Sequence, residues 1–191
     1  MKYDLTKKTT RGAQRTLAAF SDTMFALLMK KPFAEITVNE LCQRSNYPRA
    51  TFYNYFDDKY DLLNYCWYCL GKQIRLEEYK QLDPDACLYV FFDRFYDLAA
   101  AHVEMIQRIL KFNSENSLLL HHFQVYFNTQ IDKIFRGCPY TGKYRIPYDI
   151  VAKHYSNTIL LIFEECFLNK RCNSKSQAHD YLQYLLGSLA N

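Results

Sequence analysis

The sequence predicts an all-α protein in which a three-helix N-terminal domain with a helix-turn-helix precedes a larger helical domain. Apolar residues recur every three to four positions along most of the 191-residue chain, as in amphipathic helices. The strict alternation of polar and apolar residues that is typical of strands is nearly absent. With only 5 Gly and 5 Pro, the chain contains no low-complexity stretch or linker. We therefore expect one continuous series of packed helices.

The first helix is expected from about Arg11 to Met29. The apolar residues at helical spacing within it are Leu17, Phe20, Met24, Phe25 and Leu28. It should end near Lys30 and Lys31, whose charges suit a helix C-terminus, because Pro32 cannot continue the helix.

The second helix has a sharp predicted start. Thr37 and Glu40 form a capping box, and Ile36 is placed to pack on Leu41. The helix should be short and end at Asn46, which is suited to the left-handed conformation that closes a helix.

A third short helix is expected from Arg49 to Tyr55, after Pro48. Phe52 and Phe56 lie four residues apart and should point into the small core. Asp57 or Asp58 then caps a fourth helix.

The remaining helices are expected at about residues 58–80, 84–100, 102–113, 116–136, 147–169 and 175–189. Pro84 and Pro147 suit the first turns of their helices, and Ser174 with Gln177 forms a second capping box. The only long irregular segment is Gly137 to Ile146. We place the domain boundary at residue 60, giving domains 1–60 and 61–191.

The net positive charge of the chain comes entirely from its first third. Residues 1–60 contain ten Lys and Arg against six Asp and Glu, whereas the remaining residues contain 14 of each sign. This distribution favours an N-terminal module that faces a polyanion.

A short helix, a tight turn and another short helix form the arrangement that presents a helix to the major groove of DNA. If Phe52 points inward, then Arg49, Ala50, Thr51, Tyr53 and Asn54 lie on the other faces of the third helix. Arg49 and Asn54 can make bidentate contacts with bases, whereas the hydroxyl groups of Thr51 and Tyr53 suit phosphate oxygens. The helix N-termini at Thr37 and Lys59 can also face phosphates.

The segments Ile36–Cys42, Ala50–Lys59 and Leu62–Leu63 together resemble the tetracycline-repressor family (TetR/AcrR type). The resemblance covers about residues 11–63 and rests on Thr-Val, Thr-Phe-Tyr-x-Tyr-Phe and Lys-x-x-Leu-Leu. It implies a transcriptional regulator, most often a repressor, that binds a palindromic double-stranded DNA operator as a homodimer. It also implies a C-terminal domain for dimerisation and for a small-molecule effector. The string Lys59–Leu63 is faintly similar to regulators of the dihydroxyacetone-kinase type.

The resemblance also implies roles for single residues. Thr37, Tyr53 and Lys59 correspond to positions that contact the DNA backbone, and Arg49, Ala50 and Thr51 to recognition-helix positions. The chain departs from the family at Pro48, which replaces a Ser or Thr, so we expect the corresponding phosphate contact to be lost.

Several sequence patterns that resemble enzyme or metal sites each lack a residue that the site requires. Gly137–Lys143 matches most of a P-loop, but Tyr144 follows where a Ser or Thr must hold Mg²⁺. Cys66-x-x-Cys69 has no second ligand pair and is interpreted as buried thiols. His102-x-Glu104 lacks the cysteine pair of a zinc deaminase, and the adjacent His121 and His122 diverge on a helix. We therefore predict no catalytic residue, no metal site and no cofactor.

We expect a cytoplasmic protein without membrane association. Residues 1–15 lack the apolar core of a secretory signal, and the apolar runs are far shorter than the ~20 residues of a membrane span. The 7 cysteines, an odd number, favour reduced thiols.

The aromatic body between about residues 60 and 135 is expected to enclose an effector. The alternatives are a helical adaptor that binds protein rather than DNA, or a constitutive regulator controlled by a partner protein.

Apolar stripes on the last two helices are expected to form a four-helix bundle with a two-fold mate. They consist of Val151, Tyr155, Thr158, Ile159, Ile162 and Cys166 on the first helix, and of Ala178, Tyr181, Leu182, Leu185 and Leu189 on the second.

Overall fold

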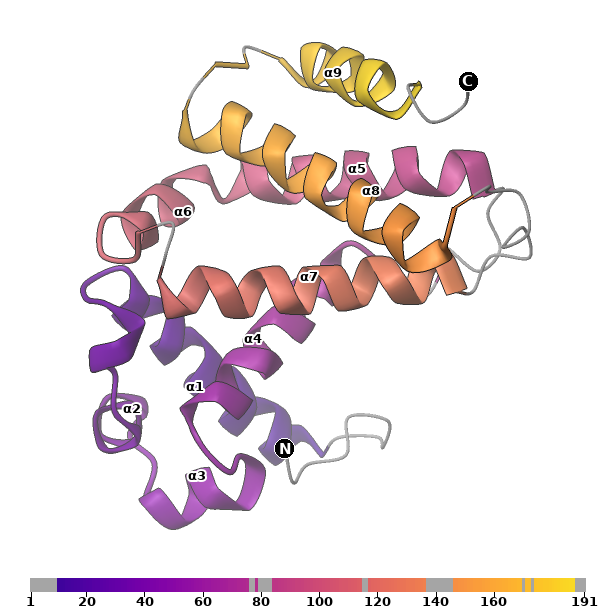
Figure 1. Cartoon of the computed structure of the whole chain (residues 1–191). Helices are drawn as coiled ribbons and strands as arrows, with labels where there is room; N and C mark the ends of the chain where they lie inside the picture. The colour runs from indigo at the N-terminus through magenta and orange to yellow at the C-terminus, as the bar shows by residue number, and fades with distance from the viewer. Residues whose placement is uncertain are drawn as a thin grey trace. The chain divides into compact units, whose positions relative to one another are not determined.

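The computed structural model describes residues 10–75, 78, 84–114, 117–136, 146–169, 171–172 and 174–187 (Figure 1). Every regular element within these ranges is helical, which confirms the predicted all-α class. The chain divides into two compact units. One contains the described residues up to Leu70 together with Arg108–Phe123, and the other contains the rest.

The first unit begins with α1 (Arg11–Leu28), the 3₁₀ turn η1 (Phe33–Glu35), α2 (Val38–Ser45), α3 (Arg49–Tyr55) and the start of α4 (Lys59–Gln73). Its centre is aromatic. The rings of Phe52 and Phe56 meet the Phe20 ring edge-on at centroid distances of 5.3 and 6.2 Å, and all three side chains are fully buried. The inward direction predicted for Phe52 and Phe56 is therefore confirmed.

The predicted helix starts rest on local hydrogen bonds. The Thr37 hydroxyl accepts from Glu40 N at 3.2 Å, and Asn46 adopts the left-handed conformation with φ 58°. Asp58, rather than Asp57, caps α4, because its Oδ1 accepts from Tyr60 N and Asp61 N at 2.8 and 2.9 Å.

The expectation that the fourth helix continues to residue 80 is wrong, since α4 ends at Gln73. Arg75 turns to a positive φ of 51° and its N–H bonds to Lys72 O, which closes the helix. The guanidinium of Arg94 on α5 then donates to the carbonyls of Ile74 and Arg75 at 3.3 and 3.4 Å. A cation from a distant helix thus meets the two carbonyls that directly follow the dipole end of α4.

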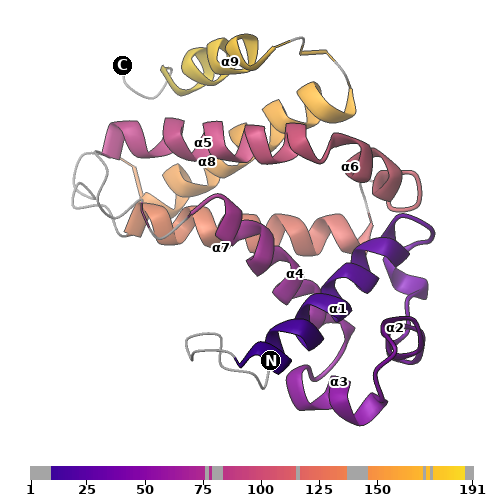
Figure 2. The same ribbon diagram turned by 180° about the vertical axis from the view of Figure 1, so that it is seen from behind.

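The second unit contains most of the later helices: α5 (Pro84–Ala101), α6 (Val103–Leu110), α7 (Leu118–Arg136), α8 (Tyr148–Phe163), the π-helical turn η3 (Glu164–Leu168) and α9 (Lys175–Gly187). Helices α6 and α7 each extend across the division between the units. Phe95 on α5 contacts Phe127 on α7 and Phe163 on α8 at 4.9 and 5.2 Å. Both views show α9 beside α8 and α5 (Figures 1 and 2). Aromatic packing therefore joins α5, α7 and α8.

Most residues of the apolar stripes predicted for a dimer interface are buried within the single chain, although Tyr181 is exposed and Leu189 lies outside the described residues. Val151, Ile159, Ala178 and Leu182 are fully buried without any partner, and Ile162 is 2% exposed. Because α8 packs through Phe163 on the aromatic core of its own unit, the most apolar side of the helix turns inward. The large apolar residues left exposed on α8 and α9 are Ile150, Leu161, Tyr181 and Tyr184.

The segment Gly137–Lys143, considered above as a partial P-loop, lies outside the described residues, as does most of the predicted irregular segment. In the described part of the chain, no helix is both long enough and apolar enough to span a membrane.

Candidate nucleic-acid interface

Tyr47 fixes the turn between α2 and α3 through its backbone and through its ring. Tyr47 N donates to Cys42 O at 3.1 Å, and the Tyr47 ring packs on Phe20 at 5.5 Å. Pro48, with φ −62°, opens α3 without a side-chain cap. The orientation of α3 therefore depends on Asn46, Tyr47 and the buried face of α3, and not on the hydroxyl cap that is usual at this position.

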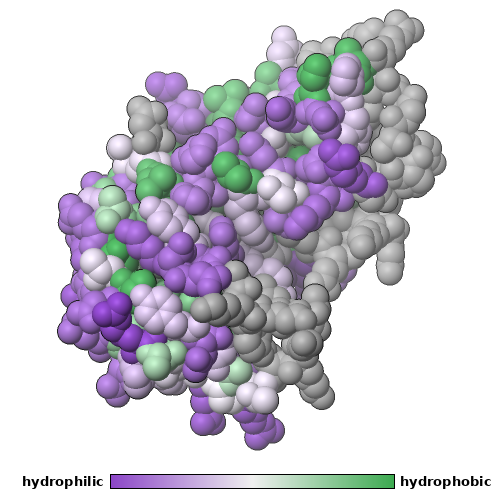
Figure 3. Space-filling view, turned by 60° about the horizontal axis from the view of Figure 1, so that its bottom comes forward, coloured by the Kyte–Doolittle hydropathy of each residue, from purple (hydrophilic) through white to green (hydrophobic). Residues whose placement is uncertain are grey.

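The outer surface of α3 carries the predicted DNA-contacting residues. Arg49, Ala50 and Asn54 are exposed, Tyr53 is 37% exposed and Thr51 is half-buried. In Figure 3, which brings the bottom of Figure 1 forward, hydrophilic residues cover much of the facing surface and apolar residues are scattered among them. The structure thus brings these five residues together on one short helix.

Arg49 and Tyr53 form a pair along α3. The Arg49 Nη2 donates to Tyr53 Oη at 3.4 Å, and the guanidinium lies 5.8 Å from the centroid of the Tyr53 ring. This hydrogen bond raises the pKa of Arg49, so the side chain remains a cation under all ordinary conditions. Arg49 therefore presents a permanent positive charge, and the Tyr53 side chain holds the guanidinium in place.

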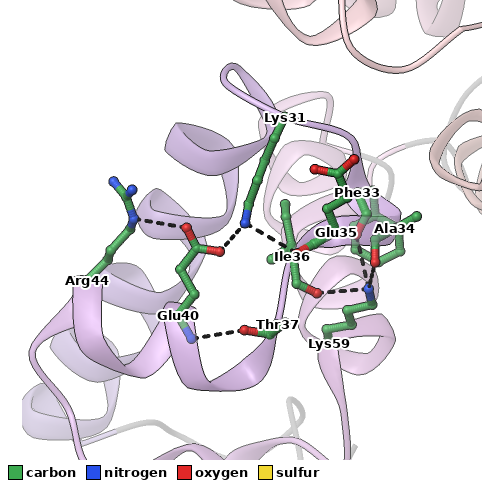
Figure 4. Close-up of polar contacts among 9 residues, drawn as sticks. All are labelled: Lys31, Phe33, Ala34, Glu35, Ile36, Thr37, Glu40, Arg44 and Lys59. Atoms are coloured by element: carbon green, nitrogen blue, oxygen red, sulfur yellow. Dashed lines mark hydrogen bonds and ion pairs between the residues drawn. The ribbon is translucent and has the colours of Figure 1, made fainter.

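The ammonium group of Lys59 binds the backbone of η1 (Figure 4). Its Nζ donates to the carbonyls of Phe33, Ala34 and Ile36 at 3.0, 2.9 and 2.8 Å, and lies 4.8 Å from the centroid of the Phe33 ring. Burial, and next the charge of Lys31, lower the pKa of Lys59. A lysine has three N–H donors, so the side chain expected to meet DNA phosphate has all of them directed at its own chain.

The N-terminus of α4 is also occupied. The Asp58 carboxylate accepts two of its backbone N–H groups, and Asp57 N donates to Asp61 Oδ2 at 3.0 Å. A phosphate at this end of α4 would have to compete with these carboxylates.

A second network fixes the start of α2, and sequence reasoning missed it (Figure 4). Glu40 forms ion pairs with Lys31 and with Arg44, the latter with Arg44 Nε at 3.3 Å from Glu40 Oε1. Lys31 Nζ also donates to Glu35 O at 3.2 Å. The Glu40 carboxylate therefore binds two cations and does not complete the capping box with Thr37. The exposed Thr37 hydroxyl accepts from Glu40 N and keeps its own proton to donate.

Asn113, which follows α6, anchors η1 from a distance of 80 residues in sequence. Its Oδ1 accepts from Phe33 N at 2.9 Å and its Nδ2 donates to Ile109 O at 3.0 Å, while the residue is 1% exposed. Only the fold could reveal this contact, since nothing near Asn113 in sequence points to η1. Lys59 and Asn113 together fix the backbone that leads into α2.

No group of His, Cys, Asp and Glu side chains that could hold a metal ion occurs in the described ranges. The contacts at α2 and α3 consist of hydrogen bonds, ion pairs and aromatic packing.

The comparisons with known proteins agree with this geometry. Residues 22–66 match the family model for bacterial regulatory proteins of the tetR family. The resemblance to the tetracycline-repressor family is therefore confirmed for the helix-turn-helix. No curated protein sequence matches the chain.

Solved structures share the fold over most of the chain. A TetR-family transcriptional regulator from Syntrophomonas wolfei is 17% identical with a TM-score of 0.68, covering 93% of this chain and 96% of that chain. The dihydroxyacetone kinase operon activator DhaS is 17% identical with a TM-score of 0.53, covering 92% and 96%. The fatty acid degradation regulator FadR from Bacillus halodurans is 15% identical with a TM-score of 0.54, covering 94% and 97%. All three are described as regulators and none as an enzyme.

Proposed function

We propose that this chain, which carries the helix-turn-helix domain of the TetR family, represses transcription by binding a palindromic DNA operator as a homodimer. The observation that carries the proposal is the exposed face of α3, where Arg49, Tyr53 and Asn54 surround a helix anchored by buried Phe52. A helix held rigidly on one side and polar on the other is suited to the major groove.

The residues divide the recognition between bases and phosphates. Arg49 and Asn54 are placed for bidentate contacts with base edges, and Ala50 for an apolar contact with a thymine methyl group. The hydroxyl groups of Thr37, Thr51 and Tyr53 are placed for phosphate oxygens. We assign Lys59 a different role from the one expected: its side chain positions η1, because its donors already bind Phe33, Ala34 and Ile36.

The experiment is a fluorescence-anisotropy titration of labelled operator DNA with the wild-type chain, Arg49→Ala and Arg108→Ala. Arg108 is an exposed arginine on α6 and serves as the matched control. Arg49→Ala should lose about 1–3 kcal/mol of binding free energy, mainly at one base position. Equal affinities for the two variants would overturn the assignment of α3 as the recognition helix.

We also propose that a small apolar or aromatic effector binds the second unit and lowers operator affinity. Two buried polar atoms there, Asn128 Oδ1 on α7 and His154 Nε2 on α8, have no hydrogen-bond partner among the described residues. Buried polar atoms without a partner can be the groups that orient a ligand in an otherwise apolar site. Effector binding then acts through its preference for the conformation that does not bind DNA.

A thermal-shift screen of apolar and aromatic compounds tests the effector proposal. A true effector raises the melting temperature of the wild-type chain, and raises it less for Asn128→Leu, in which the polar group is replaced. If a broad panel shifted neither protein, the alternative of a constitutive regulator controlled by a partner protein would be favoured.

A further inference from the structure

The turn between α8 and α9 brings two thiol groups together. Cys166 lies in η3 and is 8% exposed, whereas Cys172 lies in the loop before α9 and is partly exposed. Both cysteines are free, and the Cys172 thiol is close enough to Cys166 to raise the pKa of the Cys166 thiol. The two sulfurs are therefore neighbours without being bonded.

Glu165 folds the chain back so that these thiols meet. Its carboxylate accepts from Asn169 Nδ2 at 2.8 Å and from Arg171 Nη1 at 3.2 Å. Its carbonyl accepts from Arg171 N at 2.8 Å, which places residue 171 beside residue 165. The neighbouring Cys172 thus comes to lie beside Cys166. The π-helical turn that carries Cys166 is a rare geometry that occurs frequently at functional sites.

The same turn also starts α9. The Cys172 thiol donates to Ser174 O at 3.2 Å, and the Ser174 hydroxyl accepts from Gln177 N at 3.2 Å, which caps the helix. A chemical change at Cys172 therefore acts directly on the residue that holds the N-terminus of α9.

We propose that Cys166 and Cys172 form a reversible redox switch, in which a hydroperoxide oxidises them to a disulfide that rearranges the start of α9. This site is independent of the proposed DNA contacts on α3.

The chemistry balances in two steps. The Cys172 thiolate attacks an oxygen of the hydroperoxide, the O–O bond breaks, and the departing oxygen takes up a proton to leave as water or an alcohol. The sulfur of Cys166 then attacks the resulting sulfenic acid, so that the S–S bond forms and the hydroxyl group leaves as water with the Cys166 proton. In sum, the two thiols lose two electrons and two protons, and the hydroperoxide is reduced.

Their surroundings assign the two thiols different roles. Burial, and next the nearby Cys172 thiol, raise the pKa of Cys166, so this thiol stays protonated and does not react first. Cys172 is less buried and meets the oxidant. When the disulfide forms, Cys172 loses the S–H that donates to Ser174 O. The start of α9 should then open more readily.

Peptide mapping of the whole native protein tests the proposal. After treatment with hydrogen peroxide and alkylation of the remaining thiols, trypsin cleaves behind Arg171 and separates the two cysteines unless a disulfide joins them. We expect a linked Cys166–Cys172 peptide that dithiothreitol releases. Oxidation of Cys172 to sulfinic acid without linkage, or pairing of either cysteine with another thiol, would overturn the proposal.

Cys69→Ser, which removes another partly exposed thiol, should still form the linked peptide, whereas Cys172→Ser should not. If Cys172→Ser failed to fold, the reduced wild-type chain itself supplies a second readout. It should bind phenylarsine oxide across both thiols, and peptide mass should locate the arsenic at Cys166 and Cys172. Hydrogen exchange at Gln177 and Ala178 should become faster on oxidation, and unchanged exchange in the linked protein would refute the effect on α9.

Discussion

At the scale of single residues, the ammonium of Lys59 binds the protein's own backbone. The carbonyls of Phe33, Ala34 and Ile36 satisfy its three donors, and the Phe33 carbonyl also accepts from Ile36 N within the turn. Asn113 supplies the matching acceptor for Phe33 N. The entry into α2 therefore depends on two residues that lie outside the helix-turn-helix.

Lys59→Met should lower the free energy of unfolding by about 2 kcal/mol, because it leaves partly buried carbonyls without a charged donor. Urea denaturation measures the change, with Lys153→Met on the exposed face of α8 as the control. Lys59 would instead be a phosphate ligand if its variant had the stability of the control and had lost affinity for all DNA sequences alike.

At the scale of single helices, a boundary could be predicted from the sequence where residues close to it in the chain determine it. Thr37, Asn46, Asp58 and Ser174 act on backbone groups a few positions away, so the helix boundaries that they set could be predicted. The end of α4 could not, since Arg94 contributes to it from another helix. Periodicity likewise identified the apolar stripe of α8 but could not say whether the core or a partner covers it.

The attachment of α9 to α5 is an electrostatic contact between elements. Asp93 lies 2.6 Å from His179 Nε2 and 3.0 Å from Lys175 Nζ, and Lys175 also binds Asp97 at 2.9 Å. Burial raises the pKa of Asp93, but hydrogen bonds from His179 and Lys175 outweigh it, so the pKa lies below its ordinary value of 3.8. The carboxylate therefore stabilises the folded chain above that value, and the stabilisation is lost as pH falls through the lowered pKa.

Asp93→Asn should accordingly reduce stability at neutral pH by about 1 kcal/mol or less, since the pair is largely solvent-screened. The difference from the wild type should shrink as the pH falls below the ordinary pKa of 3.8 and should vanish once the pH is below the lowered pKa of the folded chain. Denaturation midpoints at pH 7 and pH 3 measure it, with the exposed Asp180→Asn on α9 as the control. A difference that stayed constant with pH would show that the charge of Asp93 contributes nothing.

At the scale of the whole molecule, a palindromic operator requires two copies of the chain. The apolar surface available for contact between the two copies consists of four outward-facing residues on α8 and α9. They are Ile150, Leu161, Tyr181 and Tyr184. Tyr184 is 82% exposed, the highest exposure among the large apolar residues exposed on α8 and α9. We therefore expect the proposed dimer to form through this outer face, which includes Tyr181 of the predicted stripes.

The double variant Leu161→Asp with Tyr184→Asp should be a folded monomer, because both side chains lie outside the core. Light scattering measures the mass and circular dichroism the helix content. Val125→Asp, which alters a residue of α7 that is 51% exposed, is the control and should leave the dimer intact. A double variant that still had the mass of a dimer would place the interface elsewhere.

The central claim, that the α3 face reads DNA, is tested most directly by selection of binding sites from random duplexes with the wild-type chain. We predict an enriched palindrome with half-sites about one helical turn apart, ~34–36 Å. Its affinity should fall with salt by a slope of about −0.9 per phosphate contacted. Arg49→Ala should relax the preference at one position in each half-site. Recovery of no enriched sequence, or of the same sequence with the same affinity by Arg49→Ala, would contradict the account.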